Sequence, residues 1–258
     1  MNGETRSPIK SKPLRLPGQS LQEERNKLFE DKVEAPLLWV AMMFTLALLE
    51  WWRFYADAKP TPILFTFVLL VSIAFAAWRI WRIRPKMRSL LQGVEGEKVV
   101  GQFLERLRED GYHIFHDVIG DGFNVDHVII GKGGVLTVET KTWSKPANGD
   151  ARVKFDGEKL SIGSFEPDRD PIIQAKAQAS WLGRLLEESS GTRLTVRPVI
   201  VFPGWFVEQS PGSTKELWVL EPKALPAFLS REPASLSDEQ VKLLSFHLSR
   251  FIRVQEAE

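Results

Sequence analysis

The chain of 258 residues is long enough for one large domain or two small ones, and its 43% of hydrophobic residues exclude a fully disordered protein. It contains no cysteine, which excludes disulfide bonds, cysteine-ligated zinc or iron–sulfur sites, and a cysteine nucleophile. The net charge of +1 hides an asymmetry, because residues 1–88 carry 14 Lys and Arg against 8 Asp and Glu, whereas residues 89–258 carry 20 against 25. A basic first part and an acidic second part predict two regions with different surroundings.

Residues 1–34 are expected to form a cytoplasmic tail followed by a short helix. The first 19 residues combine prolines with basic side chains, which favours a disordered tail. Ser20 and Glu23 have the spacing of a capping box, in which the two side chains satisfy free backbone amides at a helix start. We therefore expect a charged helix from Ser20 to about Ala35.

Two apolar runs without charged residues follow at 35–49 and 61–78. A helix needs about 20 residues to cross ~30 Å of hydrocarbon. The second run reaches that length with its aromatic flank, and the first does so only if Glu50 and Arg53 snorkel. Residues 35–82 are therefore predicted to form a transmembrane helical hairpin. A buried hairpin in a soluble domain and a re-entrant hairpin in one leaflet are the alternatives. Because a long polar stretch precedes the first run, a cleaved signal peptide is not expected.

Basic residues predict the orientation of this hairpin. They flank its outer ends, at Arg25, Lys27 and Lys32 before the first run and at Arg79, Arg82, Arg84, Lys86 and Arg88 after the second. The connecting turn holds only Arg53 and Lys59. Because positive loops stay inside, we expect a multi-pass protein of the cell (inner) membrane with both termini and the soluble domain in the cytoplasm.

Residues 89–258 are expected to form one further domain. Helical periodicity covers 94–110, a second helix begins at Asp170-Pro171 and runs to about 188, and an amphipathic helix covers 238–253. Strand-like runs lie at 112–119, 124–130, 134–142, 196–202 and 217–220, and a short hairpin joins 152–155 to 159–162. This order predicts an α/β fold, in which a small mixed sheet is flanked by helices.

The glycine-rich turn at residues 131–134 predicts how two of these strands pair. A two-residue turn and a four-residue loop both place Asp126 opposite Glu139, with Cβ atoms ~5 Å apart, and Asn124 opposite Lys141. Like charges placed directly opposite are destabilising, so such carboxylates usually share a proton or a cation. Oxygen ligands favour Mg²⁺ or Mn²⁺, and Lys141 can orient or acidify a water there. The pattern therefore indicates metal-assisted phosphodiester hydrolysis.

Less specific interpretations stand beside this one. The Asp, Glu and Lys side chains could form a solvated surface cluster, although the two strands are otherwise apolar, which favours covered faces. Glu97 lies at the edge of an apolar helical stripe and could equally be a first-turn residue that complements the helix dipole. His113 and His116 lack the further ligands of a zinc site and are expected on strand faces.

Together these motifs resemble the nuclease-related domain (NERD) over about residues 93–202. The resemblance rests on Gly93-x-x-Gly96-Glu97, on Asn124-Val-Asp126-His127, on the run from Gly134 to Glu139-Thr-Lys141, and on Gln174. It implies a restriction-endonuclease-like fold with a PD-(D/E)xK core. In such a core Asp126 and Glu139 hold the metal ion, Lys141 positions the attacking water, Glu97 assists the metal site, and Gln174 lies close by. Val125 replaces the proline that precedes the aspartate in the motif, which leaves the ligand set unchanged.

Two functions follow from the sequence. The first is a membrane-anchored nuclease that uses Mg²⁺ or Mn²⁺, with the lipid bilayer and nucleic acid as partners and with DNA favoured over RNA. The alternative is a non-catalytic scaffold on a nuclease-like fold that binds nucleic acid or protein. The acidic balance of residues 89–258 favours neither function, although Arg152, Lys154 and Lys159 could still line a groove for nucleic acid.

Overall fold

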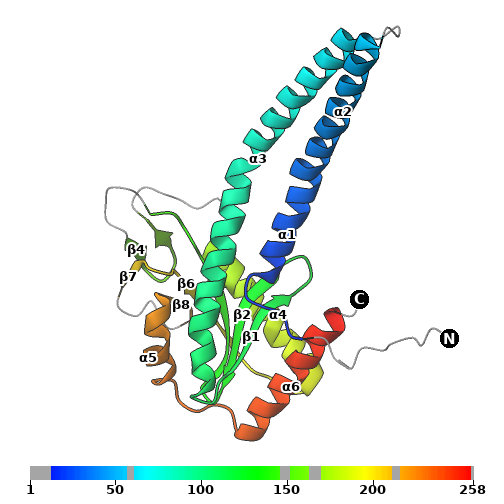
Figure 1. Ribbon diagram of the computed structural model, residues 1–258. Helices are drawn as coiled ribbons and strands as arrows, with labels where there is room; N and C mark the ends of the chain where they lie inside the picture. The colour runs from blue at the N-terminus through cyan, green and yellow to red at the C-terminus, as the bar shows by residue number, and fades with distance from the viewer. Residues whose placement is uncertain (1–12, 57–60, 146–151, 163–169, 211–215, 257–258) are drawn as a thin grey trace, which may run out of the picture. The chain divides into compact units, whose positions relative to one another are not determined.

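The computed structural model describes residues 13–56, 61–145, 152–162, 170–210 and 216–256. The chain divides into two compact units, one formed by residues 20–92 and the other by residues 93–258 together with the first 19 residues. Long helices make up the first unit, and an α/β sandwich makes up the second (Figure 1).

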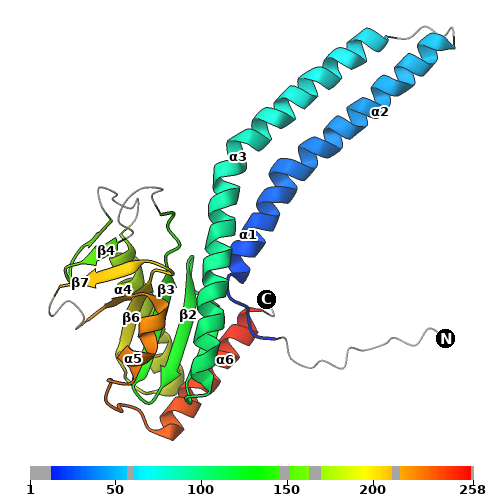
Figure 2. The same ribbon diagram turned by 60° about the vertical axis from the view of Figure 1, so that its left-hand side comes forward.

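The helical unit consists of two antiparallel arms. The first arm is continuous and comprises α1 (Gln19–Phe29), a π-helical turn (Glu30–Glu34) and α2 (Ala35–Tyr55). The second arm is the first part of α3 (Pro62–Glu105), which runs beside α2 in both views (Figures 1 and 2). The Nε1 of Trp51 donates to the Oγ1 of Thr66 at 3.1 Å, and the Nζ of Lys86 pairs with Glu24 at 2.7 Å, so side chains of the two arms contact each other near both ends of the hairpin.

Both arms are long and apolar enough to cross a membrane, over Gln19–Tyr55 and Pro62–Arg108. Large apolar side chains on them are exposed, among them Leu38, Trp39, Phe44, Phe67 and Trp78. Contiguous apolar surfaces of this kind are uncommon on soluble proteins and mark contact with lipid or with another protein. The unit could therefore span a membrane as a hairpin.

The expected helix boundaries in this unit are wrong at two points. The first helix begins at Gln19, directly after Gly18 (φ 72°), so Ser20 lies inside it and cannot be its N-cap. The helix also does not stop near Ala35. Pro36 lacks an N–H and would crowd the preceding turn, and the wider π-helical turn before it lets the helix continue. The turn residues at 57–60, including Lys59, lie outside the described residues.

The separate helix expected at 94–110 is instead the end of α3. That helix passes through Pro85 and Gly93 and ends at Glu105, where a 3₁₀ turn (Arg106–Arg108) follows. Residues 79–92 contain no glycine or asparagine that would favour a helix end, and Pro85 removes only one N–H from the hydrogen-bond ladder.

The sandwich is built on a five-stranded mixed sheet in the order β1-β2-β3-β6-β8. Its strands are β1 (His113–Ile119), β2 (Asn124–Gly131), β3 (Gly134–Thr140), β6 (Val196–Val201) and β8 (Trp218–Leu220). The first three are antiparallel, whereas β3, β6 and β8 are parallel. All five overlap the strands expected from the sequence, although β3 ends two residues earlier than expected.

Helices cover both faces of this sheet (Figure 2). On one face, α4 (Pro171–Ser190) and α6 (Asp238–Gln255) bury Val128, Ile130 and Val135. On the other, the end of α3 and the short α5 (Leu225–Leu229) bury Ile129, Leu136 and Val138. The two sets alternate along β2 and β3, as side chains of a strand must. The predicted fold class, a mixed sheet flanked by helices after two apolar helices, is confirmed.

A second, smaller sheet has the order β5-β4-β7. Residues of β4 (Arg152–Phe155) pair antiparallel with β5 (Leu160–Ser161), which confirms the hairpin predicted there. Sequence patterns missed β7 (Phe206–Gln209), the 3₁₀ turn Pro222–Ala224 and α5, which are all shorter than six residues and carry no clear periodicity.

The segment before α1 packs against the sandwich. Leu14 contacts the core under α4 and α6, and Arg15 is only 6% exposed. The Nε of Arg15 lies 2.7 Å from Asp117, and its Nη1 pairs with Glu256. The disordered tail expected for residues 1–19 is therefore wrong for 14–18, because Arg15 has two carboxylate partners in the fold. Residues 1–12 lie outside the described residues.

Candidate active site

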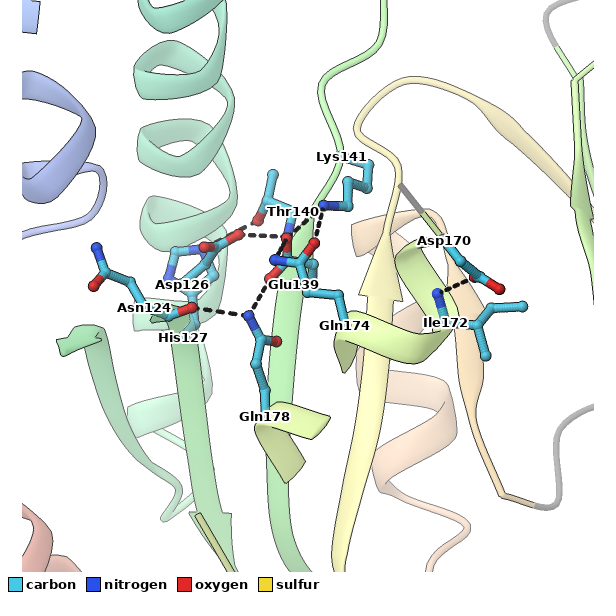
Figure 3. Close-up of polar contacts among 10 residues, drawn as sticks. All are labelled: Asn124, Asp126, His127, Glu139, Thr140, Lys141, Asp170, Ile172, Gln174 and Gln178. Atoms are coloured by element: carbon cyan, nitrogen blue, oxygen red, sulfur yellow. Dashed lines mark hydrogen bonds and ion pairs between the residues drawn. The ribbon is translucent and has the colours of Figure 1, made fainter. Parts of the chain in front are cut away.

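The site lies where β2 and β3 separate. Their backbone pairing runs from Gly131↔Gly134 to His127↔Val138, which confirms the predicted register over these residues. The expected pairs of Asp126 with Glu139 and of Asn124 with Lys141 lie beyond the last backbone pair. Beyond that pair the amide N–H of Thr140 donates to the Oδ2 of Asp126 at 2.7 Å (Figure 3). A side-chain carboxylate thus takes the place of a backbone acceptor in the ladder. This hydrogen bond brings Asp126 next to the strand that carries Glu139.

Glu139 is the most heavily hydrogen-bonded group of the site and is 4% exposed. Its Oε1 accepts from the Nζ of Lys141 at 2.6 Å and from the Nε2 of Gln174 at 2.8 Å, and its Oε2 accepts from the Nε2 of Gln178 at 2.7 Å (Figure 3). An ion pair and two amide donors therefore fix the orientation of both carboxylate oxygens.

Lys141 links the two elements of the site. Its amide donates to Val201 of β6 at 2.9 Å, which continues the sheet beyond β3. Its Nζ donates to Gln174 at 3.0 Å as well as to Glu139. A lysine ammonium has three donors, so one is left for a water or a phosphate oxygen. Lys141 therefore lies where a cationic group can meet an incoming anion.

The start of α4 positions the two glutamines. As predicted, the Asp170 side chain caps the helix by accepting from the amide of Ile172 at 2.8 Å, and Pro171 occupies the first turn. Gln174 and Gln178 then follow one turn apart on the same face. Gln178 was missed at the sequence level, although its i, i+4 spacing from Gln174 is a signal. It is 1% exposed and also donates to the carbonyl oxygen of Asn124 at 2.8 Å.

Glu97 adds a third buried acid from α3, since it is 6% exposed. Burial, followed by the charges of Asp117 and Glu139, raises its pKa to about 8. The pKa of Asp126 is also raised well above its usual value, by burial first and then by the charges of Glu139 and Glu97. Protein cations thus do not fully compensate the negative charge of these acids.

The three acids carry the type of ligand atom that a hard divalent cation prefers. All three acids offer carboxylate oxygens, the ligands that Mg²⁺ and Mn²⁺ prefer, and their mutual repulsion would be relieved by a cation. The buried Oε1 of Gln178 has no hydrogen-bond partner among the described residues and is a fourth oxygen nearby. Within the described part of the chain, however, no three His, Asp or Glu side chains already stand at ligand spacing.

The structure places the predicted site residues as follows. Glu139, Lys141 and Gln174 are in direct contact, Asp126 joins them through the amide of Thr140, and Glu97 is linked to them by its charge. His113 and His116 both lie on β1, as expected. His116 contacts a second buried histidine, His127, which belongs to the matched motif but was given no role from the sequence. Arg152 and Lys154 are exposed on β4, and Lys159 lies in the turn after it.

A mixed sheet with a Glu-x-Lys pair beside a neighbouring Asp defines a nuclease-like class of protein. Residues 92–203 match the family described as the nuclease-related domain (NERD), the family that the sequence motifs resemble. No curated protein matches the chain.

Among solved structures, the chain is similar to SfsA from Pyrococcus furiosus in complex with Ca²⁺. The two share 19% identity with a TM-score of 0.25, over 51% of this chain and 55% of SfsA. The chain thus spans about half the length of SfsA, and at this TM-score the likeness says nothing about function.

Proposed function

We propose that the protein is a membrane-anchored, divalent-metal-dependent nuclease that hydrolyses phosphodiester bonds in nucleic acid. The observation that carries this proposal is the contact of Glu139 with Lys141, held by Gln174 beside Asp126, within the span that matches the nuclease-related domain. Nuclease-related domains generally depend on a divalent metal ion, and the three buried acids of this site offer the oxygen ligands that such an ion prefers.

Asp126, Glu139 and Glu97 are the residues that would hold the cation. Bound Mg²⁺ or Mn²⁺ would supply positive charge to the anionic transition state of phosphodiester hydrolysis. Lys141 is assigned to orient the attacking water with the donor that its contacts to Glu139 and Gln174 leave over. Gln174 and Gln178 keep the Glu139 carboxylate in one orientation, since each donates to one of its oxygens.

Nucleic acid is the proposed substrate, with DNA favoured over RNA. Arg152 and Lys154 alternate with buried residues along β4, which leaves both cations on one exposed face of the small sheet. The guanidinium of Arg152 lies 5.5 Å from the ring centroid of Phe206, whose side chain is also exposed. Exposed cations beside an aromatic ring are suited to phosphates and bases.

The apolar arms are proposed to anchor the protein in the cell (inner) membrane, with both termini and the nuclease-like unit in the cytoplasm. The basic residues beyond both outer ends of the hairpin support this orientation. Protease added outside intact spheroplasts should then cut at most the turn at residues 53–61. Cleavage within residues 93–258 under these conditions would overturn the orientation.

One observation favours a second function, a non-catalytic scaffold that binds nucleic acid or protein. Both oxygens of Glu139 already accept protein hydrogen bonds, and the described residues contain no group of three ligands at metal-binding spacing. A nuclease must rearrange these contacts when the cation binds, whereas a scaffold can keep them.

Cleavage assays on the full chain in detergent distinguish the two functions. Plasmid, linear duplex, single-stranded DNA and RNA would each be incubated with Mg²⁺, Mn²⁺ or EDTA. We expect metal-dependent cleavage that is lost in Lys141→Met. The matched control is Lys132→Met on the exposed β2–β3 turn, which should cleave like the parent chain. Nucleic acid bound without cleavage under all metal conditions would support the scaffold.

A further inference from the structure

A chain of buried polar side chains lies on the α3 face of the sheet, opposite the face that α4 covers. The Nδ1 atoms of His116 and His127 are 2.9 Å apart. The Nε2 of His116 lies 2.8 Å from the Oε1 of Glu105, and the Nε2 of His127 lies 3.3 Å from the Oγ1 of Thr140. His127 is fully buried, and His116 is 7% exposed. The four side chains form one continuous line, which we call the histidine relay.

The chemistry of its members gives the relay one direction. Arg108 hydrogen-bonds both oxygens of Glu105, at 2.6 and 3.0 Å, which keeps this carboxylate ionised and therefore only an acceptor. His116 must then carry its proton on Nε2. Burial lowers the pKa of His116, so this ring is neutral. His127 is fully buried, and its described side-chain contacts are His116 and Thr140 with no acid among them, so this ring is neutral as well. The Nδ1 of His116 thus accepts from His127, whose Nε2 accepts from the hydroxyl of Thr140.

The outer end of the relay opens to solvent. The side chain of Glu105 is 44% exposed, and His116 lines a cavity of about 320 Å³ together with Glu105 and Arg108. Arg108 also donates to the carbonyl oxygen of Ile114 at 2.6 Å, which fixes the relay to β1. The exposed carboxylate therefore anchors one end of a line whose other members are buried.

The inner end reaches the candidate active site. Thr140 stands between Glu139 and Lys141 in the chain, and its own amide N–H is the donor that holds Asp126. Its side chain points away from Glu139, because neighbouring residues of a strand face opposite sides. The relay therefore contacts the side chain of Thr140 on the α3 face of the sheet, while the backbone amide of the same residue orients Asp126.

We propose that His127 and Thr140 are positioning residues, and that the relay from Glu105 fixes the backbone amide of Thr140 so that Asp126 is held ready for its cation. The catalytic meaning of this inference rests on the proposed function, whereas the direction of the relay does not. Thr137 shows that a buried threonine on β3 does not need such a partner, since its Oγ1 is buried without a hydrogen bond among the described residues. Thr140 differs from Thr137 in having a hydrogen-bond partner, His127, at a position beside the acids.

Imidazole ¹⁵N spectra of the full chain in detergent micelles test the direction of the relay. The protein has only 4 histidines, so their signals can be assigned one by one. We expect His116 as the neutral tautomer protonated at Nε2 and His127 as the neutral tautomer protonated at Nδ1. The opposite tautomers, or a charged ring at neutral pH, would overturn the relay.

Three variants test the positioning role. Thr140→Val removes the hydroxyl at nearly constant shape, Thr140→Ser keeps it, and Thr137→Val makes the same change two residues away. Calorimetric titration with Mn²⁺ should show about tenfold weaker binding for Thr140→Val, the size expected for a residue that supports a metal ligand. Thr140→Ser and Thr137→Val should bind like the parent chain.

Hydrogen exchange of the amide at position 140 gives a readout that needs no metal. Exchange should become faster in Thr140→Val, because the hydrogen bond from the side chain at position 140 to His127 is lost. It should stay slow in Thr140→Ser, which keeps the hydroxyl. Faster exchange in Thr140→Val, combined with a parent chain that binds no Mn²⁺, would refute the proposed nuclease and keep the positioning role. Unchanged exchange with unchanged Mn²⁺ binding would overturn the positioning role itself.

Discussion

The histidine relay and the acids around Glu139 are two sets of buried polar groups that differ in how their charge is compensated. On the α3 face, His116 and His127 are neutral, and each of their ring nitrogens has a hydrogen-bond partner. In the second set, by contrast, Asp126 on β2 and Glu97 on α3 have raised pKa values, because burial and neighbouring acids leave their charge uncompensated. A fold tolerates such a cost where a ligand relieves it, which is why we propose the uncompensated acids, and not the buried histidines, as the functional site.

Asp126→Asn gives the largest expected effect, because it removes one of the uncompensated charges and keeps an oxygen for the amide of Thr140. Cleavage should fall at least about 100-fold, the scale on which a missing electrostatic group affects catalysis. In EDTA the variant should be as stable as the parent chain or more stable by up to ~1 kcal/mol, since like charges on neighbouring strands repel. Mg²⁺ should raise the melting temperature of the parent chain but hardly that of the variant.

The opposite pattern would show that Asp126 is structural. If the carboxylate served only to stabilise the fold, Asp126→Asn would melt earlier than the parent chain in EDTA, and Mg²⁺ would stabilise neither protein. Melts of both proteins with and without Mg²⁺ distinguish these cases without any nucleic-acid substrate.

The pH dependence of stability measures the same uncompensated charge at Glu97. Its folded pKa of about 8 is raised above the usual value, so the folded state keeps a proton that the unfolded state loses. The contribution of this group to stability should therefore be greatest below about pH 4.5 and fall as the pH rises towards 8, by at most about 5 kcal/mol. Glu97→Gln should flatten this dependence in denaturant titrations of the metal-free chain, and saturating Mg²⁺ should also reduce it. An identical slope in the variant would remove Glu97 from the cluster.

Arg15 provides the compensated counterpart close to these acids. Its side chain and that of Asp117 are 5% and 3% exposed, so Arg15→Met leaves a buried carboxylate without its main partner. We expect a loss of about 3 kcal/mol in the free energy of unfolding, measured by chemical denaturation of the full chain in detergent. The control Arg25→Met, at an exposed position of α1, should change stability by less than about 0.5 kcal/mol. Equal effects of the two substitutions would mean that the segment 14–18 does not hold the sandwich together.

Local chemistry made part of this architecture predictable. The glycines at 131–134 define the turn and hence the register of β2 and β3, and the i, i+2 spacing of Glu139 and Lys141 puts both on one side of a strand. Asp170 and Pro171 mark the start of α4 because an N-cap and a first-turn proline act within a few residues.

Features that depend on distant parts of the chain were not predictable in the same way. The partners of Arg15 are Asp117 and Glu256, which lie over 100 and over 200 residues away in sequence. The contact of His116 with His127 likewise exists only once β1 and β2 are paired. Gln178 has a visible spacing from Gln174, but its role appears only when Glu139 is placed opposite α4.

The smallest expected effect comes from a buried group that lacks a partner but carries no charge. The Oγ of Ser245 on α6 has no hydrogen-bond partner among the described residues, whereas the Oγ of Ser190 donates to the carbonyl oxygen of Leu186 at 2.6 Å and accepts from the amide of Thr192 at 3.2 Å. Ser245→Ala should stabilise the sandwich by about 1 kcal/mol, because it removes an unsatisfied hydroxyl and favours the helix. Ser190→Ala should destabilise it by a similar amount, and neither variant should alter the response to Mg²⁺. A Ser245→Ala variant whose response to Mg²⁺ changed as that of Asp126→Asn is expected to change would contradict this reasoning. An unsatisfied polar group without charge would then be enough to affect the site, and the contrast between the histidine relay and the acids would fail.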